Sequence, residues 1–232
     1  MKHNYLFILI IILLTSGCET LYGPAMTGSN MPYQARSAYH GRDADEIWIS
    51  GAFNQGIKYA GAAEENFLVQ GSFHKSQTRE YFKATYGGYV YGGSYRANIA
   101  GISDMSFWGL GARGSIVFCL PTERADFNLI GVQGGMGGEF GQYDRFRSSR
   151  DIYWGPINPT LNYFSSIDFK LRGGSSLGVE QGFGLTGAPL TVNFTSPQFS
   201  LWGQVNLLSI DFYDWRTQGY LIWAFGASFR VN

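Results

Sequence analysis

Apolar and polar residues alternate along most of the chain beyond Glu46. A period of two places successive side chains on opposite faces of a β-strand. No long stretch shows the helical period of about 3.6 residues. The clearest alternating segments are residues 67–74, 82–91, 107–119, 129–141, 163–172 and 221–231. The body of the chain is therefore predicted to be all-β.

One face of these segments is apolar and almost free of charge, whereas the other carries Gly, Ser, Gln and ions of both signs. This pattern is typical of a membrane barrel, which turns its apolar face to lipid and its polar face to the lumen. The segments are about 10 residues long, close to the roughly 9–11 that a transmembrane β-strand needs. The sequence predicts an antiparallel transmembrane β-barrel of about 8–12 strands, with ten favoured. Strand limits stay open in residues 54–66, 90–106 and 175–213.

The N-terminus has the features of a secretory signal. Lys2 precedes an apolar run over residues 6–14, which is shorter than the roughly 20 residues of a transmembrane helix. Residues 15–18 read TSGC and resemble a bacterial lipobox, in which the cysteine is lipidated. The alternative is an ordinary signal peptide cut near Gly17. We expect three parts, namely a signal peptide over 1–17, a lipid-anchored tether over 18–44 and a barrel over 45–232.

The composition of the chain argues against several classes of function. The 232 residues include 32 Gly, 17% aromatic and 15% charged residues, with a formal net charge of zero. The chain has no excess of basic over acidic residues, which argues against nucleic-acid binding. Its 45% apolar content argues against disorder. Cys119 is the only cysteine besides Cys18, so we expect neither an intramolecular disulfide nor a thiolate metal cluster.

Three segments resemble catalytic or nucleotide-binding motifs. Residues 109–114 match G-x-G-x-x-G, but they lie inside an alternating strand and not before a helix. Residues 174–178 match G-x-S-x-G, but no histidine follows them, and a hairpin turn is favoured. His74, with Ser72 and Ser76 nearby in the sequence, is the one candidate for the catalytic site of a barrel enzyme. We expect no enzyme activity, no metal and no cofactor.

Charged residues on the inward face are the main candidate site. Charges in a narrow lumen must be paired or hydrated, and a barrel of about eight strands is nearly filled by side chains. A salt-bridged network that plugs the lumen is therefore predicted, with a narrow, weakly anion-preferring pore as the alternative. The network consists of Lys83, Arg113, Glu139, Asp168, Lys170, Arg172, Glu180 and Arg230.

Aromatic residues near strand ends suggest the interfacial girdles of a membrane barrel. Residues 142–160 form the longest expected non-strand segment and would be an extracellular loop. The girdle candidates are Tyr89, Tyr91, Tyr143, Tyr153, Trp154, Trp215 and Tyr220.

The lipobox at Cys18, the short tether and the segment GIKYAGAAEENFLVQGSF at 56–73 resemble the small outer-membrane β-barrel lipoproteins of the Bacteroidota type. The ending GYLIWAFGASFRVN, with Phe229 near the C-terminus, is similar to the closing strand of such barrels. The resemblance implies a fold and a membrane, and it implies no catalytic residues.

We therefore expect a non-enzymatic barrel, lipid-anchored in the bacterial outer membrane, with a structural or accessory role in the cell envelope. Its partners would be outer-membrane lipid and, as a candidate, another envelope protein that contacts loop 142–160. The main alternative is a surface or periplasmic β-sandwich lipoprotein that binds glycan or protein through Tyr153, Trp154 and Trp215. A pore is the second alternative. The sequence leaves open the leaflet that holds the lipid.

Overall fold

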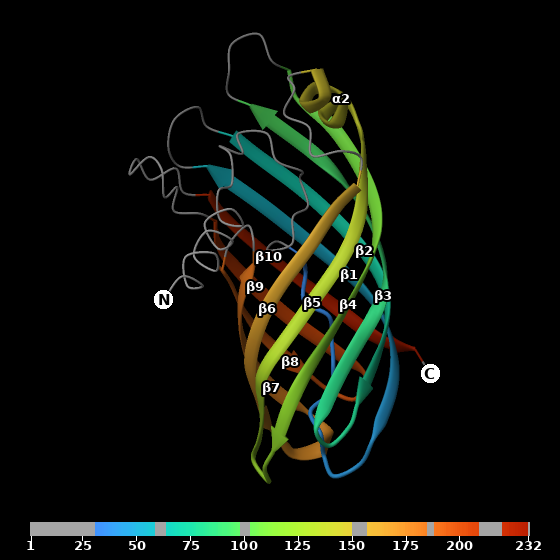
Figure 1. Cartoon of the computed structure of the whole chain (residues 1–232), viewed down its shortest axis with the longest axis vertical. Helices are drawn as coiled ribbons and strands as arrows, with labels where there is room; N and C mark the ends of the chain where they lie inside the picture. Colours follow the sequence, from blue (N-terminus) through green and yellow to red (C-terminus); the bar gives the residue numbers. More distant parts are fainter. Residues whose placement is uncertain are drawn as a thin grey trace, which may run out of the picture.

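The alternating segments form ten antiparallel strands that close into a barrel (Figure 1). The computed structural model describes residues 31–58, 64–97, 103–149, 157–184, 188–208 and 220–231. The signal peptide and Cys18 lie outside these residues. The strands are β1 (Ala44–Lys58), β2 (Glu64–Thr78), β3 (Phe82–Ala97), β4 (Met105–Pro121), β5 (Ala125–Gly141), β6 (Ile157–Lys170), β7 (Ser176–Gly184), β8 (Ala188–Thr195), β9 (Phe199–Leu208) and β10 (Tyr220–Val231).

Every strand pairs with its neighbours in the chain, and β10 closes the barrel by pairing with β1. The closing ladder runs from Ile47 opposite Val231 to Lys58 opposite Tyr220. Phe53 stacks on its cross-strand partner Phe225, with ring centroids 5.2 Å apart. The closed ten-stranded barrel confirms the predicted fold class and excludes the two-sheet sandwich.

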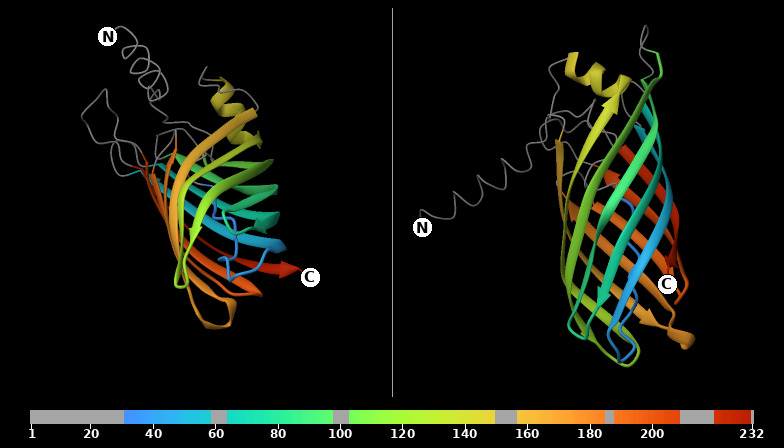
Figure 2. Two further views of the ribbon diagram at one scale, coloured as in Figure 1. Left: turned by 60° about the horizontal axis from the view of Figure 1, so that its bottom comes forward. Right: turned by 90° about the vertical axis from the view of Figure 1, so that its right-hand side faces the viewer.

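The two ends of the barrel differ in their connections (Figures 1 and 2). At one end, which we call the short-turn end, the connections are residues 79–81, 122–124, 171–175 and 196–198. At the other, which we call the long-loop end, they are residues 59–63, 98–104, 142–156, 185–187 and 209–219. Strand β1 begins at the short-turn end, where Ala44 pairs with Thr78, and β10 finishes there.

The two faces of the wall are divided as the alternation predicts. In β3, Val90 is 61% exposed on the outside, whereas Lys83 and Thr85 are buried inside. In β4, Phe118 is 64% exposed and Arg113 is buried. Apolar side chains cover the outside because each strand presents every second residue to it. So large an exposed apolar surface is foreign to a soluble monomer and suits a bilayer.

Strand β5 contains a bulge that the alternation did not reveal. Its register against β6 shifts between Asn128 and Gly131, and both Leu129 and Ile130 point outward. A bulge inserts an extra residue and reverses the inward parity beyond it. Consequently Asp126 faces the interior, although uninterrupted alternation would place it toward lipid.

The girdle prediction is wrong for three aromatic residues. Tyr89, Tyr91 and Tyr143 are buried in the interior of the barrel. Inward glycines make this possible. A Cβ on Gly109 would lie 2.2 Å from Cζ of Tyr91, and one on Gly111 would lie 2.4 Å from the Tyr89 hydroxyl. The two rings lie against a wall without side chains. The structure does not describe Tyr153, Trp154, Trp215 or the Tyr220 side chain.

Residues 142–160 are only partly a loop, contrary to the prediction. Helix α2 (Gln142–Ser149) caps one side of the long-loop end, and β6 already begins at Ile157 (Figure 1). The G-x-S-x-G segment lies at a turn, as predicted, with the 3₁₀ turn η2 (Arg172–Gly174) before β7. Within the described residues, no helix is both long and apolar enough to span a bilayer.

Part of the expected tether lies inside the barrel. Residues 31–38 are buried, and Figure 2 shows this segment, in blue, within the ring of strands. We call residues 31–40 the thread. Strand β1 then begins at Ala44, one residue before the predicted boundary. The alternation could not reveal this burial, because ten residues without periodicity carry no sequence signal of it.

A charged residue on the outward face should destabilise the barrel in a bilayer. Val90 lies near the middle of β3, so Val90→Arg should lower the free energy of unfolding by about 2–4 kcal/mol in phospholipid vesicles. Urea titration would measure this, with Glu123→Arg in the exposed turn 122–124 as the matched control. Equal stability of the two variants would contradict a lipid-facing wall.

Candidate functional site

The interior of the barrel is the candidate site, and the thread runs lengthwise through it. The thread belongs to no strand, so its backbone carbonyls need donors from the wall. At the short-turn end, the Thr78 hydroxyl donates to the Ser37 carbonyl at 3.2 Å. The backbone N–H of Tyr39 donates to the Asp126 carboxylate at 2.6 Å. Inward polar side chains thus take the place of a strand partner.

Higher in the barrel, Nε2 of His74 lies 3.0 Å from the Ala35 carbonyl, and the Arg113 guanidinium donates to the Pro32 carbonyl. Both wall residues are buried. His74 therefore holds the thread, and its ring is out of reach of solvent. At the top of the thread, Met31 packs with inward aromatic side chains such as Tyr91.

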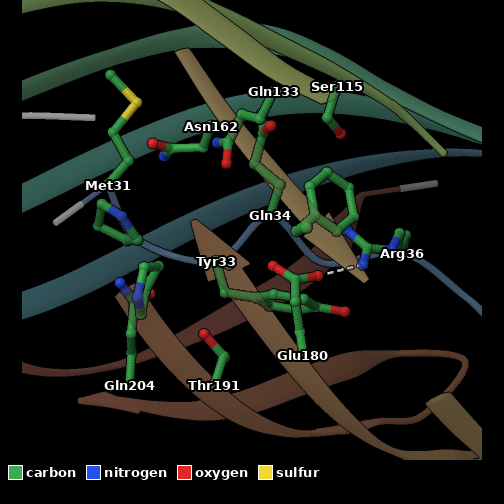
Figure 3. A pocket seen from close by; sticks show the side chains of 14 residues that line it. Met31, Tyr33, Gln34, Arg36, Ser115, Gln133, Asn162, Glu180, Thr191 and Gln204 are labelled. Carbon is green, nitrogen blue, oxygen red and sulfur yellow. Dashed lines mark hydrogen bonds and ion pairs between the residues drawn. The ribbon is translucent and has the colours of Figure 1, made fainter. Parts of the chain in front are cut away.

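Arg36 is the charged centre of the thread (Figure 3). Its guanidinium forms an ion pair with Glu180 of β7 and donates to the Ser166 hydroxyl of β6 at 3.3 Å. The Phe164 ring lies 5.0 Å from the guanidinium carbon, and the Tyr33 ring lies 5.4 Å from it. A buried cation without a partner is strongly destabilising, so this pair fixes the thread against the far wall.

A second cluster lies near the short-turn end. Nζ of Lys83 is 2.8 Å from both Asp126 and Asp168, and all three side chains are buried. Lys170 reaches the other oxygen of Asp126 at 2.9 Å, and the Asn128 amide donates to Asp168 at 2.8 Å. Two ammonium groups thus balance two carboxylates across β3, β5 and β6. We call these four charged residues the lower cluster.

A third group joins helix α2 to the wall at the long-loop end. Arg147 of α2 lies 2.6 Å from Glu139 of β5, and both side chains are fully buried. Asp144 lies 3.4 Å from the same guanidinium. Beside them, Tyr143 stacks on Tyr95 with ring centroids 4.2 Å apart. These contacts hold α2 over the lumen.

The structure places seven of the eight predicted lumen charges in the interior or at its rim. Arg172 is the exception, because β6 ends at Lys170 and Arg172 is exposed in η2. Arg230 is half-buried at the short-turn end, 3.0 Å from Glu46. Arg113 contacts the thread through a carbonyl and not a carboxylate.

Sequence reasoning missed four partners of this network. Arg36 lies in the expected tether, Glu46 stands at the very start of the first strand, and Arg147 lies in the expected loop. Asp126 was hidden by the bulge in β5. The sequence does contain one signal of this bulge. Asp126 is a carboxylate at a position that uninterrupted alternation would turn toward lipid, and such a residue indicates a change of register.

A small cavity adjoins the thread. A cavity of about 20 Å³ lies beside Tyr33, Arg36, Gln133 and Gln204 (Figure 3), which is room for about one water molecule. In the part of the chain that the structure describes, no three His, Cys, Asp or Glu side chains are grouped to hold a metal ion.

No protein-family model matches the chain, and no curated protein matches it. Solved structures of similar fold include outer-membrane β-barrel proteins. The β domain of the Bordetella autotransporter BrkA has a TM-score of 0.38 and 9% identity, covering 81% of this chain and 98% of that one. OprG from Pseudomonas aeruginosa has a TM-score of 0.37 and 10% identity, with 83% and 98% covered. Ail of Yersinia pestis has a TM-score of 0.30 and 12% identity, with 82% and 98% covered.

Breaking the lower cluster should cost much more than breaking an exposed pair. Lys83→Met leaves two buried carboxylates short of a cation, so we expect a loss of about 3–5 kcal/mol in the free energy of unfolding. The exposed pair of Arg96 with Asp104 is the control, and Arg96→Ala should cost at most about 1 kcal/mol. The double variant Lys83→Met, Asp168→Asn should recover part of the loss. Equal costs for both single variants would contradict the cluster.

Proposed function

We propose that this protein is a non-enzymatic barrel of the bacterial outer membrane, anchored by lipid on Cys18 and closed to solutes by its own thread. Its role is then structural or accessory in the cell envelope, with the long-loop end as the contact surface for lipid or another envelope protein. The observation that carries this proposal is the burial of residues 31–38 inside the ring of strands.

The membrane location is supported by the outer surface. Side chains such as Phe73, Trp108, Ile130 and Phe183 are more than half exposed around the barrel. Water would make such a surface aggregate, whereas hydrocarbon solvates it. The inward polar residues and the complete ring of backbone ladders suit the same environment, because a closed barrel has no unpaired edge.

Closure is supported by the thread and its contacts. An ion needs a continuous hydrated path, and the thread occupies the lumen from Met31 to the short-turn end. Most inward charges beside it form ion pairs, such as Glu180 with Arg36 and Lys83 with Asp126 and Asp168, and Arg113 donates to the Pro32 carbonyl. The described interior therefore presents no ring of one sign like those of selective pores. The pore is therefore the less favoured reading.

Conductance across planar bilayers tests closure. We expect the intact protein to insert without conductance steps above background, because the thread blocks the path. A variant without residues 31–40 should conduct steadily, and Arg36→Ala, which removes the ion pair with Glu180, should open intermittently. Each variant is first checked for the heat-dependent gel shift of a folded barrel. Regular steps from the intact protein would support the pore instead.

Extraction of a Cys18→Ala variant tests whether strands or lipid hold the protein in the membrane. The strands supply the apolar surface, so this variant should still require detergent. It should also migrate differently on SDS gels before and after boiling. A Cys18→Ala protein that dissolved in buffer without detergent would overturn the integral barrel.

A further inference from the structure

Among the described residues of the interior, Arg113 carries a positive charge that no carboxylate balances. Its Nη1 donates to the Pro32 carbonyl, and no described acidic side chain forms an ion pair with it. The other Lys and Arg side chains of the described interior each form an ion pair with an aspartate or a glutamate. They are Arg36, Lys83, Arg147, Lys170 and Arg230.

The Arg113 guanidinium lies deep in the barrel. Arg113 is the middle residue of β4, eight positions from Met105 and eight from Pro121, and it is only 4% exposed. Its Nε and Nη2 are buried and have no hydrogen-bond partner in the described chain. A guanidinium does not lose its proton in proteins. Because a buried charge without a counter-charge is costly, the positive charge and two unused donors call for a negative ligand.

The side chains around the guanidinium supply no such negative charge. The residues opposite Arg113 on the two neighbouring strands are Gly87 of β3 and Gly135 of β5, which have no side chains. His74 is the next residue across Gly87, and its Nε2 is already engaged with the thread. The Tyr89 ring lies 5.8 Å from the guanidinium carbon. An imidazole and a phenol carry no negative charge at neutral pH, so the surroundings are polar but do not neutralise the cation.

We infer that Arg113 and the thread form a binding site for one monatomic anion of the halide class, with chloride as its biological member. The cavity of about 20 Å³ adjoins this region (Figure 3). Its lining includes Pro32, which accepts from Arg113, and Ser115, the next inward residue of β4. Arg36 and Glu180 also line it, and their charges cancel in the ion pair. The cavity holds about one water-sized particle, which excludes sulfate, phosphate and organic acids.

The anion links the thread to the wall. The thread covers Arg113 by placing the Pro32 carbonyl on its Nη1, so the ion is taken up as the thread settles in the lumen. A water molecule in the same place would hydrate the donors but would leave the charge unbalanced. The bound anion therefore stabilises the folded barrel and the seated thread. This role goes beyond the proposed function and does not depend on the lipid anchor or on a task in the envelope.

Thermal unfolding of the full chain in detergent, followed by the gel shift of the folded barrel, tests the site. A ligand that binds only the folded state raises the Tm as its concentration increases. Sodium chloride and sodium bromide should raise the Tm, whereas sodium gluconate and sodium sulfate at the same ionic strength should not. Arg113→Gln removes the charge and keeps an amide donor for Pro32, so its Tm should lose the dependence on chloride. Arg230→Gln, which alters a cation paired with Glu46, is the matched control and should keep it.

Two results would overturn the inference. One is the same Tm for the parent protein in chloride and in gluconate, and the other is an unchanged chloride dependence in Arg113→Gln. If Arg113→Gln does not fold, crystals of the parent protein grown in sodium bromide decide the matter. An anomalous bromide peak within hydrogen-bond distance of Nε or Nη2 of Arg113 is expected, and no peak there would overturn the site. Neither result bears on the membrane location or the lipid anchor, which extraction of Cys18→Ala tests separately.

Discussion

A barrel of ten strands encloses more space than a barrel of about eight, whose own side chains just fill it. This constraint governs the arrangement of the interior. On the side of β2 to β5, tyrosine rings lie over inward glycines and fill the lumen from the wall. On the side of β6 to β9, the filling comes from the thread, with Tyr33 and Arg36 against Phe164 and Glu180. The thread is therefore part of the core and not an appendage to it.

Charge places a second requirement on the same space. The lower cluster is balanced within the wall, since Lys83 and Lys170 face Asp126 and Asp168. Glu180 and Glu139 instead take their cations from outside the wall: Glu180 binds Arg36 of the thread, and Glu139 binds Arg147 of α2. A buried carboxylate without its partner is costly. The wall thus holds the thread through Glu180 and helix α2 through Glu139. The thread and α2 cover different parts of the lumen.

The strands and their faces could be predicted from the sequence because a period of two is a strong signal over about ten residues. Three features of the interior could not be predicted from the alternation. One extra residue in β5 reversed the parity and hid Asp126. Tyr89 and Tyr91 follow the inward parity, but their positions near strand ends suggested a girdle, and only the cross-strand register shows that glycines oppose them. The thread lacks any period, so its burial depends on contacts that are remote in sequence.

Those contacts also suggest the order in which the interior forms. Ser37 binds Glu46 only nine residues away, and the contacts of the thread with His74 and Thr78 span 39 and 41 residues. The pair of Arg36 with Glu180 spans 144 residues. Because closing a longer loop costs more entropy, the near contacts are favoured first. The contacts of the thread with β1 and β2 therefore close at a smaller entropic cost than its ion pair with Glu180 of β7.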